Sequence, residues 1–280
     1  MSSAITPLTS PESGPRAELM GADWNRCQRR ALYAAAGGIA AFVLVGLLLW
    51  VTGGIDPRRQ FFLSYLVAFN YWLGGALGCL VLLMLQYVTG GAWGLMLRRI
   101  LEAAAGTLPL LAVLFLPVLW GLPFLSEYVQ WQPLQTSAEL HFKAVWLSAP
   151  LVLVRAVVYF ACWIGLARLF RGWSKRQDEG ADGRILERCE ELGAPGMVIY
   201  GLTITFASID GVMALEPDWY STIYPVMFGV AQLLNGFAFA LTVLLALADR
   251  PPFAGAEWRS KPQSAREEQC ITIRQFFRDF

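Results

Sequence analysis

Histidine is almost absent from this chain of 280 residues, in which His141 is the only one. A haem b held between a pair of axial histidines therefore cannot be ligated by this chain alone. The five cysteines form no C-x-x-C or C-x-x-C-H motif, and this excludes the common zinc, iron–sulfur and covalent haem patterns. We expect no metal site, haem or iron–sulfur cluster in the chain.

Charged residues are also scarce. They make up 15% of the chain and hydrophobic residues 56%, whereas soluble domains average about 25% and about 45–50%. The net charge of +1 offers no basic excess for a nucleic-acid partner. The apolar residues gather in runs longer than about 18 residues, which is typical of helices that cross a lipid bilayer.

The apolar runs predict an all-α, polytopic membrane protein with about six transmembrane helices. Residues 1–28 have no periodicity and no signal-peptide pattern, so we expect a disordered cytoplasmic tail. Residues 29–248 form the predicted transmembrane domain, and residues 249–280 a polar cytoplasmic tail. The spans are expected at 31–53, 61–88, 107–125, 144–170, 196–215 and 222–248.

Basic residues in the connections predict the orientation. They concentrate at both termini and in the connections after the second and fourth spans, whereas the connection at 216–221 carries only Glu216 and Asp218. The positive-inside rule places the basic connections and both termini in the cytoplasm. Glu216 is then expected on the outer side.

The connection between the second and third predicted spans is expected to contain a helix. Residues 92–105 have the apolar face of a short amphipathic helix, which we expect to lie in the cytoplasmic interface. Its charged residues, Arg98, Arg99 and Glu102, are expected away from that face.

Glycine and proline predict how two of the spans pack and bend. Gly74 and Gly78 form a GxxxG pair, which is common where membrane helices approach closely. Pro109, Pro117 and Pro123 are expected to kink the third span.

Ionisable residues within apolar runs are the main candidates for a site, because a charge in lipid is costly. Asp210 lies inside the fifth run, and Glu216 follows it at the turn. Arg155 lies deep in the fourth run, and we expect it to pair with Asp210. Tyr159 follows Arg155 at i+4, on the same helical face. The site is read as catalytic, with Asp210 as a proton acceptor or relay.

Other interpretations of these residues remain open. The pair of Arg155 and Asp210 is equally compatible with a structural ion pair that fixes helix packing. Asp210 is also compatible with a helix-end carboxylate bonded to Ser208 or Ser221.

Asn70 and Tyr71 add polar groups to the second span. They could bond a carbonyl oxygen of a quinone, and with Tyr159 they form the predicted cofactor-binding set. Hydrogen bonding between helices is the alternative.

Residues 200–247, with the pattern S-I-D…L-E-P-D-W-Y-S-T-I-Y, resemble a quinone-binding membrane subunit of alternative complex III, a quinol:cytochrome c oxidoreductase. Residues 65–121 and 155–170 support the resemblance. That family is similar to the polysulfide-reductase (NrfD-like) membrane subunits, which have a pair of four-helix bundles and no haem.

The resemblance implies a subunit of a quinol-oxidising complex in the bacterial cytoplasmic membrane, not active alone. Its cofactor would be menaquinone or ubiquinone, and its role quinol binding, proton translocation or both. Its partners would be other membrane subunits and subunits carrying haem c and iron–sulfur clusters. Asp210 and Glu216 match the family's acidic positions. A non-catalytic anchoring or assembly subunit is the alternative, and a transporter ranks last because no internal repeat is evident.

The chain departs from the family's pattern at three places. Gly211 stands where a tryptophan usually follows the aspartate, and Gln86-Tyr87 stands where histidine is expected. The family also continues into further spans, whereas residues 254–280 contain none. We therefore expect a C-terminally truncated chain, with one four-helix bundle plus extra helices.

Overall fold

The structure is a computed structural model that describes residues 28–30, 32–33, 36–38, 40–41, 43–48, 51, 57–90, 93–125, 145–178, 184–216 and 219–247. Across these ranges the chain is helical and contains no strand. It divides into a unit at Met1–Phe61 and a unit at Phe62–Phe280, and the site lies in the second. Apart from residue 28, which is helical, the predicted tails at 1–28 and 249–280 lie outside the described residues.

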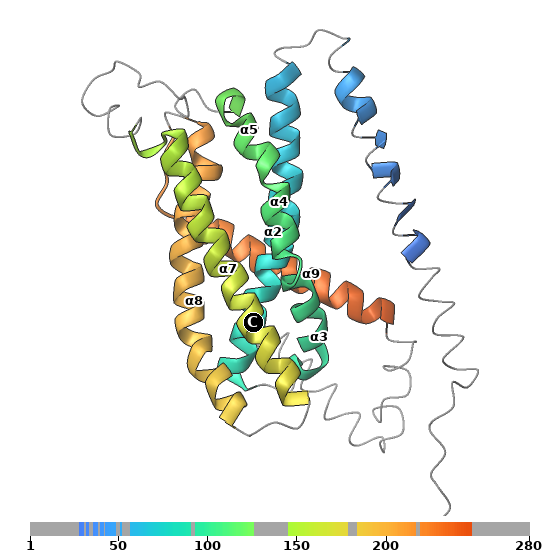
Figure 1. Ribbon diagram of the computed structural model, residues 1–280, viewed down its shortest axis with the longest axis vertical. Coiled ribbons are helices and arrows are strands. Elements are labelled where there is room, and N and C mark those ends of the chain that lie inside the picture. Colours follow the sequence, from blue (N-terminus) through green and yellow to red (C-terminus); the bar gives the residue numbers. More distant parts are fainter. Residues whose placement is uncertain are drawn as a thin grey trace, which may run out of the picture. The chain divides into compact units, whose positions relative to one another are not determined.

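Long helices dominate the second unit (Figure 1). Among the described residues, four helices (α2, α7, α8 and α9) are long and apolar enough to cross a membrane, and α3 to α5 could form a bent fifth span. The protein is therefore an all-α, multi-pass membrane protein, as predicted. The elements are α2 (Pro57–Thr89), α3 (Trp93–Ala105), α4 (Leu108–Leu114), α5 (Leu116–Leu125), α7 (Ala149–Asp178), α8 (Arg184–Gly211), the 3-10 helix η1 (Met213–Leu215) and α9 (Tyr224–Leu247).

The observed helix ends differ from the predicted spans, most clearly in α8. This helix begins at Arg184, well before the predicted start at residue 196, and continues through Pro195. Its end at Gly211 precedes η1, which occupies the last residues of the predicted span. Hydropathy marks only the apolar part of a helix, whereas backbone hydrogen bonding continues through the polar first turns. The first predicted span, 31–53, is described only in part, and its described residues are helical.

The third predicted span is broken, as its prolines indicated. Residues Leu97–Leu114 and Leu116–Leu125 meet at a bend of 53°. Pro109 lies in the first turn of α4, where a proline costs no helical hydrogen bond. Pro117 follows the break directly, and Pro123 lies inside α5. The prediction of a kink is confirmed.

The amphipathic face of α3 is confirmed, but the position predicted for Glu102 is wrong. Leu97 and Leu101 are buried, and α3 packs against α7 and α9. Glu102 is buried as well, with 5% of its side chain exposed, and its oxygens lie 3.5 Å from Arg98 Nε and 3.1 Å from Arg99 Nη1. A carboxylate can be buried when opposite charges accompany it. The prediction from the amphipathic pattern failed for Glu102 because that pattern does not take ion pairs into account.

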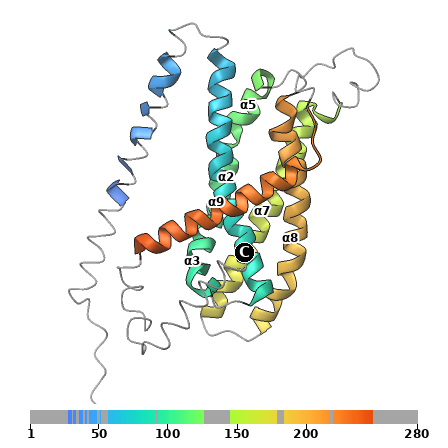
Figure 2. The same ribbon diagram turned by 180° about the vertical axis from the view of Figure 1, so that it is seen from behind.

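The core of the second unit forms around α2. Leu77, Leu80 and Met84 of this helix are fully buried, as are Trp163 and Phe170 of α7. Helices α7 and α8 run side by side in Figures 1 and 2, and α9 crosses α2 obliquely.

The crossing of α2 and α9 depends on glycine. A Cβ atom at Gly78 would overlap the carbonyl oxygen of Gln232, and one at Gly236 would overlap the backbone of α2. The thiol of Cys79 donates to the Gly236 carbonyl oxygen at 3.5 Å. The close approach predicted for the GxxxG pair is thus confirmed, with α9 as the partner helix.

Substituting Gly78 by alanine is expected to force α9 away from α2. Overpacking of this kind typically costs about 1–3 kcal/mol, so the thermal unfolding temperature of the purified chain in detergent should fall. Gly165→Ala on α7 is the matched control, because a Cβ atom there would meet nothing within 4 Å. It should melt at or slightly above the wild-type temperature. Equal melting of Gly78→Ala and wild type would contradict the glycine crossing.

Candidate functional site

Asp210, near the end of α8, is paired with Arg155 of α7. Arg155 Nε lies 2.8 Å from Asp210 Oδ2, and Arg155 Nη2 lies 3.0 Å from Oδ1. This is the bidentate geometry in which a guanidinium binds a carboxylate most strongly. The side chains are only 16% and 6% exposed. The pairing predicted from the sequence is confirmed, because α7 and α8 lie side by side.

Two further donors complete the surroundings of the carboxylate. The Tyr159 hydroxyl donates to Asp210 Oδ2 at 2.9 Å, and the Trp146 indole N–H donates to Oδ1 at 3.1 Å. An ionised carboxylate offers about four acceptor positions, and these donors together with Arg155 fill them. We call Trp146, Arg155, Tyr159 and Asp210 the Asp210 network.

Trp146 is the member of the network that the sequence did not reveal. Its carbonyl oxygen accepts a hydrogen bond from Arg155 Nη2 at 2.8 Å, and its ring centroid lies 4.3 Å from Arg155 Cζ, a cation–π contact. Trp146 precedes α7, separated from it by a turn at Leu147. Because that turn sets its position, helical spacing from Arg155 carries no signal for it.

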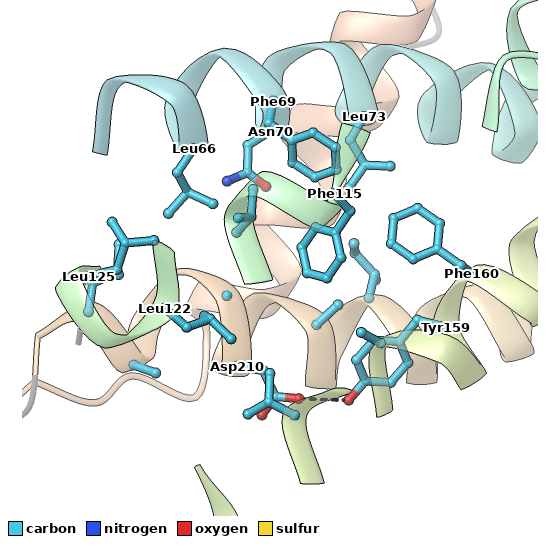
Figure 3. Close-up of a pocket in the computed structure, with 18 of the residues that line it drawn as sticks. Leu66, Phe69, Asn70, Leu73, Phe115, Leu122, Leu125, Tyr159, Phe160 and Asp210 are labelled. Carbon is cyan, nitrogen blue, oxygen red and sulfur yellow. Dashed lines mark hydrogen bonds between the residues drawn. The ribbon is translucent and has the colours of Figure 1, made fainter. Parts of the chain in front are cut away.

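An apolar cavity of about 70 Å³ lies against the network. Phe69, Phe115 and Phe160 contribute aromatic walls, with neighbouring ring centroids 5.5 and 5.4 Å apart. Figure 3 shows Asn70 on the α2 side of this space, and Tyr159 and Asp210 across from it. Apolar walls with a few polar groups are typical of a small-molecule site.

The structure brings together some of the predicted site residues and separates others. Arg155, Asp210 and Tyr159 meet, and Asn70 lines the same cavity. Tyr71 does not line it. Its side chain is 62% exposed, and its carbonyl oxygen accepts a hydrogen bond from Asn235 Nδ2 at 2.8 Å.

Glu216 also lies outside the lining of the cavity. It follows η1, which contributes Leu215 to the lining, and its side chain is exposed. The 3-10 turn directs the chain away before Glu216 is reached. Asp218 falls outside the described residues.

The alternative predicted for Asp210, a helix-end bond to Ser208 or Ser221, is not what the structure shows, because the donors to its oxygens are Trp146, Arg155 and Tyr159. The Ser208 hydroxyl donates to the carbonyl oxygen of Thr205 at 2.9 Å. Gly211 lines the cavity beside Asp210, and a Cβ atom there would meet nothing within 4 Å. The space next to the carboxylate is therefore open at the position where the family's pattern has a tryptophan.

Two further hydrogen bonds join neighbouring helices inside the unit. The Trp163 indole donates to Thr203 Oγ1, and the Tyr200 hydroxyl donates to Gln232 Oε1, each at 2.8 Å. They connect α7 with α8 and α8 with α9.

The described residues contain no group of three or more His, Cys, Asp and Glu side chains arranged to hold a metal ion.

Comparison with models of known protein families gives no match, and comparison with curated proteins gives none either. The function is therefore argued from the site itself, and the resemblance to alternative complex III stays a prediction.

Asp210→Asn should strongly destabilise the protein, because it leaves the buried charge of Arg155 without its partner. Breaking a buried pair from one side typically costs about 3–5 kcal/mol. Arg155→Met combined with Asp210→Asn should regain part of this stability, since no unpaired charge remains. The measurement is a double-mutant cycle of unfolding free energies for the purified chain.

The control is Glu190→Gln, which removes an exposed carboxylate from the same helix and should leave stability unchanged. Additive effects of the Arg155 and Asp210 substitutions would show that the ion pair contributes no coupling.

Proposed function

We propose that this chain is an integral-membrane subunit of a quinol-oxidising complex of the alternative complex III type, and that it accepts protons released by quinol. The observation that carries the proposal is the position of Tyr159. Its side chain lines the apolar cavity, and its hydroxyl donates to the buried carboxylate of Asp210. A ligand hydroxyl in the cavity would thus lie next to a ready hydrogen-bonded relay.

Tyr159 rather than Asp210 would contact the ligand. The acceptor positions of Asp210 are filled by donors of the chain itself. The Tyr159 oxygen donates its proton to Asp210 but still has acceptor capacity. A quinol O–H could donate to this oxygen while the tyrosine proton moves to Asp210. Arg155 keeps its charge throughout and holds the Asp210 carboxylate in place to receive that proton.

The residues around the cavity suit a quinol ring in their chemistry. Aromatic side chains favour stacked or edge-on packing against a ring, and Phe69, Phe115 and Phe160 are available. The amide of Asn70 can donate to a ring oxygen from the side opposite Tyr159. A bound quinol supplies the electrons and protons of the reaction. The electrons would pass to haem c or iron–sulfur centres of partner subunits.

The size of the cavity limits how a ring could enter. About 70 Å³ is enough for several water molecules, which need roughly 10–15 Å³ each. Sites that enclose a whole ligand measure about 300–1,000 Å³. Ring binding therefore requires wall side chains to move, and in the present form the cavity suits a short chain of water molecules.

The proposed orientation places both termini in the cytoplasm of a bacterial cell. Arg99 Nη1 lies 3.5 Å from Ser174 Oγ, so the basic residues of α3 lie beside the basic last turn of α7, which contains Lys175 and Arg176. Basic residues gathered at one end of a helical unit favour the cytoplasmic side. Asp210, near the other end of α8, would then lie toward the outer side.

A non-catalytic anchoring or assembly subunit is the second candidate. The observation in its favour is again the Asp210 network, because its carboxylate is satisfied without any ligand. A structural ion pair between α7 and α8 would look the same. The candidates differ in what the Tyr159 hydroxyl does.

Tyr159→Phe separates the candidates, because it removes the relay hydroxyl and keeps the ion pair. In the complex purified through a tag on this chain, quinol oxidation should fall by at least about 10²-fold, the lower range for a positioned proton-transfer group. Stability should change by only about 1 kcal/mol, as for one lost hydrogen bond.

The control is Tyr220→Phe, which removes a hydroxyl from a side chain that is 79% exposed and should leave turnover unchanged. Wild-type turnover in Tyr159→Phe would reject the relay and favour the anchoring role. Failure of any redox-active subunit to copurify with the chain would reject the quinol-oxidising complex itself.

A further inference from the structure

A second and larger hollow lies between α2 and α9, with a volume of about 460 Å³. We call it the α2–α9 groove. Its walls are apolar or small along most of their length, with Val67 and Gly74 on α2 and Ala231, Leu234 and Ala238 on α9. Several of these side chains are exposed on the outside of the unit. The groove therefore opens toward the surface that a multi-pass protein presents to lipid or to partners.

The groove and the enclosed cavity share part of their lining. Asn70 and Phe228 line both of them. The groove and the cavity that holds Tyr159 and Asp210 in its lining are thus bordered by the same polar and the same aromatic side chain. Helices α2 and α9 both contribute to the lining of each space, α9 with Phe228 in the case of the enclosed cavity.

The polar groups of the groove are mostly used within the chain. Asn235 Nδ2 donates to the Tyr71 carbonyl oxygen, and Gln232 Oε1 accepts from Tyr200. Gln232 Nε2 differs, because it is buried and has no hydrogen-bond partner among the described residues. An unpaired buried amide donor is costly, so this nitrogen favours an occupant or a water molecule that brings an oxygen.

We propose that the α2–α9 groove holds the isoprenoid tail of the quinol and is the lateral entrance through which the ring reaches the enclosed cavity. This inference rests on the proposed function. An isoprenoid tail is a flexible hydrocarbon, which matches the apolar walls, and it reaches a protein from within the bilayer. Asn70 and Phe228 form the gate, and Gln232 Nε2 offers a hydrogen bond to a ring oxygen that passes along an otherwise apolar route.

The groove reduces what the small enclosed cavity has to accommodate, although its wall side chains still have to move to admit a ring. Only the ring has to enter past Phe228, while the tail stays in the larger space outside. At Gly78 and Gly236 the backbones of α2 and α9 are in contact. The groove lies beside that crossing. A Cβ atom at Gly74 would lie 3.3 Å from Gln232 Cγ, so the absence of a side chain there keeps the groove open.

The test uses quinones with the same ring, with and without a tail. The full chain in lipid nanodiscs is titrated with menadione and with geranylgeranyl-substituted menadione. Ala231→Trp fills the groove from an exposed position that does not line the enclosed cavity. It should weaken the equilibrium affinity for the tailed quinone by at least about tenfold, because less of the tail can be buried. The equilibrium affinity for menadione should stay unchanged, because a narrowed entrance changes the rate of binding and not the affinity.

The matched control is Ala246→Trp, an equally large change at an exposed position of the same helix that lines neither space. Both quinones should bind it as they bind wild type. A tailed quinone with a photoreactive group at the end of its tail gives an independent measurement. Its cross-links should fall on 67–74 and 231–238.

The possible outcomes separate failure of this inference from failure of the proposed function. If wild type binds neither quinone, the quinol role itself fails, and the groove assignment with it. If wild type binds both and Ala231→Trp leaves the tailed affinity unchanged, only the groove assignment is overturned. An equal loss of both affinities in Ala231→Trp also overturns it, as do cross-links elsewhere. If Ala231→Trp leaves quinone binding unchanged but loses a partner subunit when the complex is purified through a tag on this chain, the groove holds a membrane helix of that partner and the inference is overturned.

Discussion

The ion pair between Arg155 and Asp210 is the interaction on which the candidate site depends. Either charge alone is costly in a lipid-embedded helix, so each stabilises the other. Their pairing fixes the position of α7 along α8. The Trp146 indole and the Tyr159 hydroxyl occupy the remaining acceptor positions of the carboxylate. Because Tyr159 is held by this bond, its hydroxyl has a defined place at the wall of the enclosed cavity.

Complete satisfaction of the carboxylate also limits what the site can do. A ligand cannot bond Asp210 without displacing a donor, so any exchange of protons with the cavity has to pass through Tyr159. This gives the site a single point of contact on the α7–α8 side and leaves Asn70 as the polar group on the α2 side. The same arrangement explains why a structural and a chemical role are both compatible with the ion pair, and why the hydroxyl distinguishes them.

The glycines at the α2–α9 crossing have consequences well beyond local packing. They let the backbones touch, which brings Phe228 of α9 to the wall of the enclosed cavity and leaves the α2–α9 groove beside the crossing. The predicted close approach of the GxxxG pair was therefore correct, but its partner could not be identified from the sequence. Several helices offer small residues, and the choice among them depends on the fit of complete surfaces.

The sequence by itself determined the helical, multi-pass character of the protein, and it predicted the pairing of Arg155 with Asp210 that the structure contains. Both follow from the cost of placing charges and backbone polar groups in lipid, which acts residue by residue and can be read from hydropathy. Only the tertiary structure decided that Trp146 joins the ion pair and that Glu216 and Tyr71 lie outside the cavity. These positions depend on a turn before α7, a 3-10 turn after α8 and the rotation of α2 about its axis. Such features arise from packing among many side chains at once, so no single stretch of sequence records them.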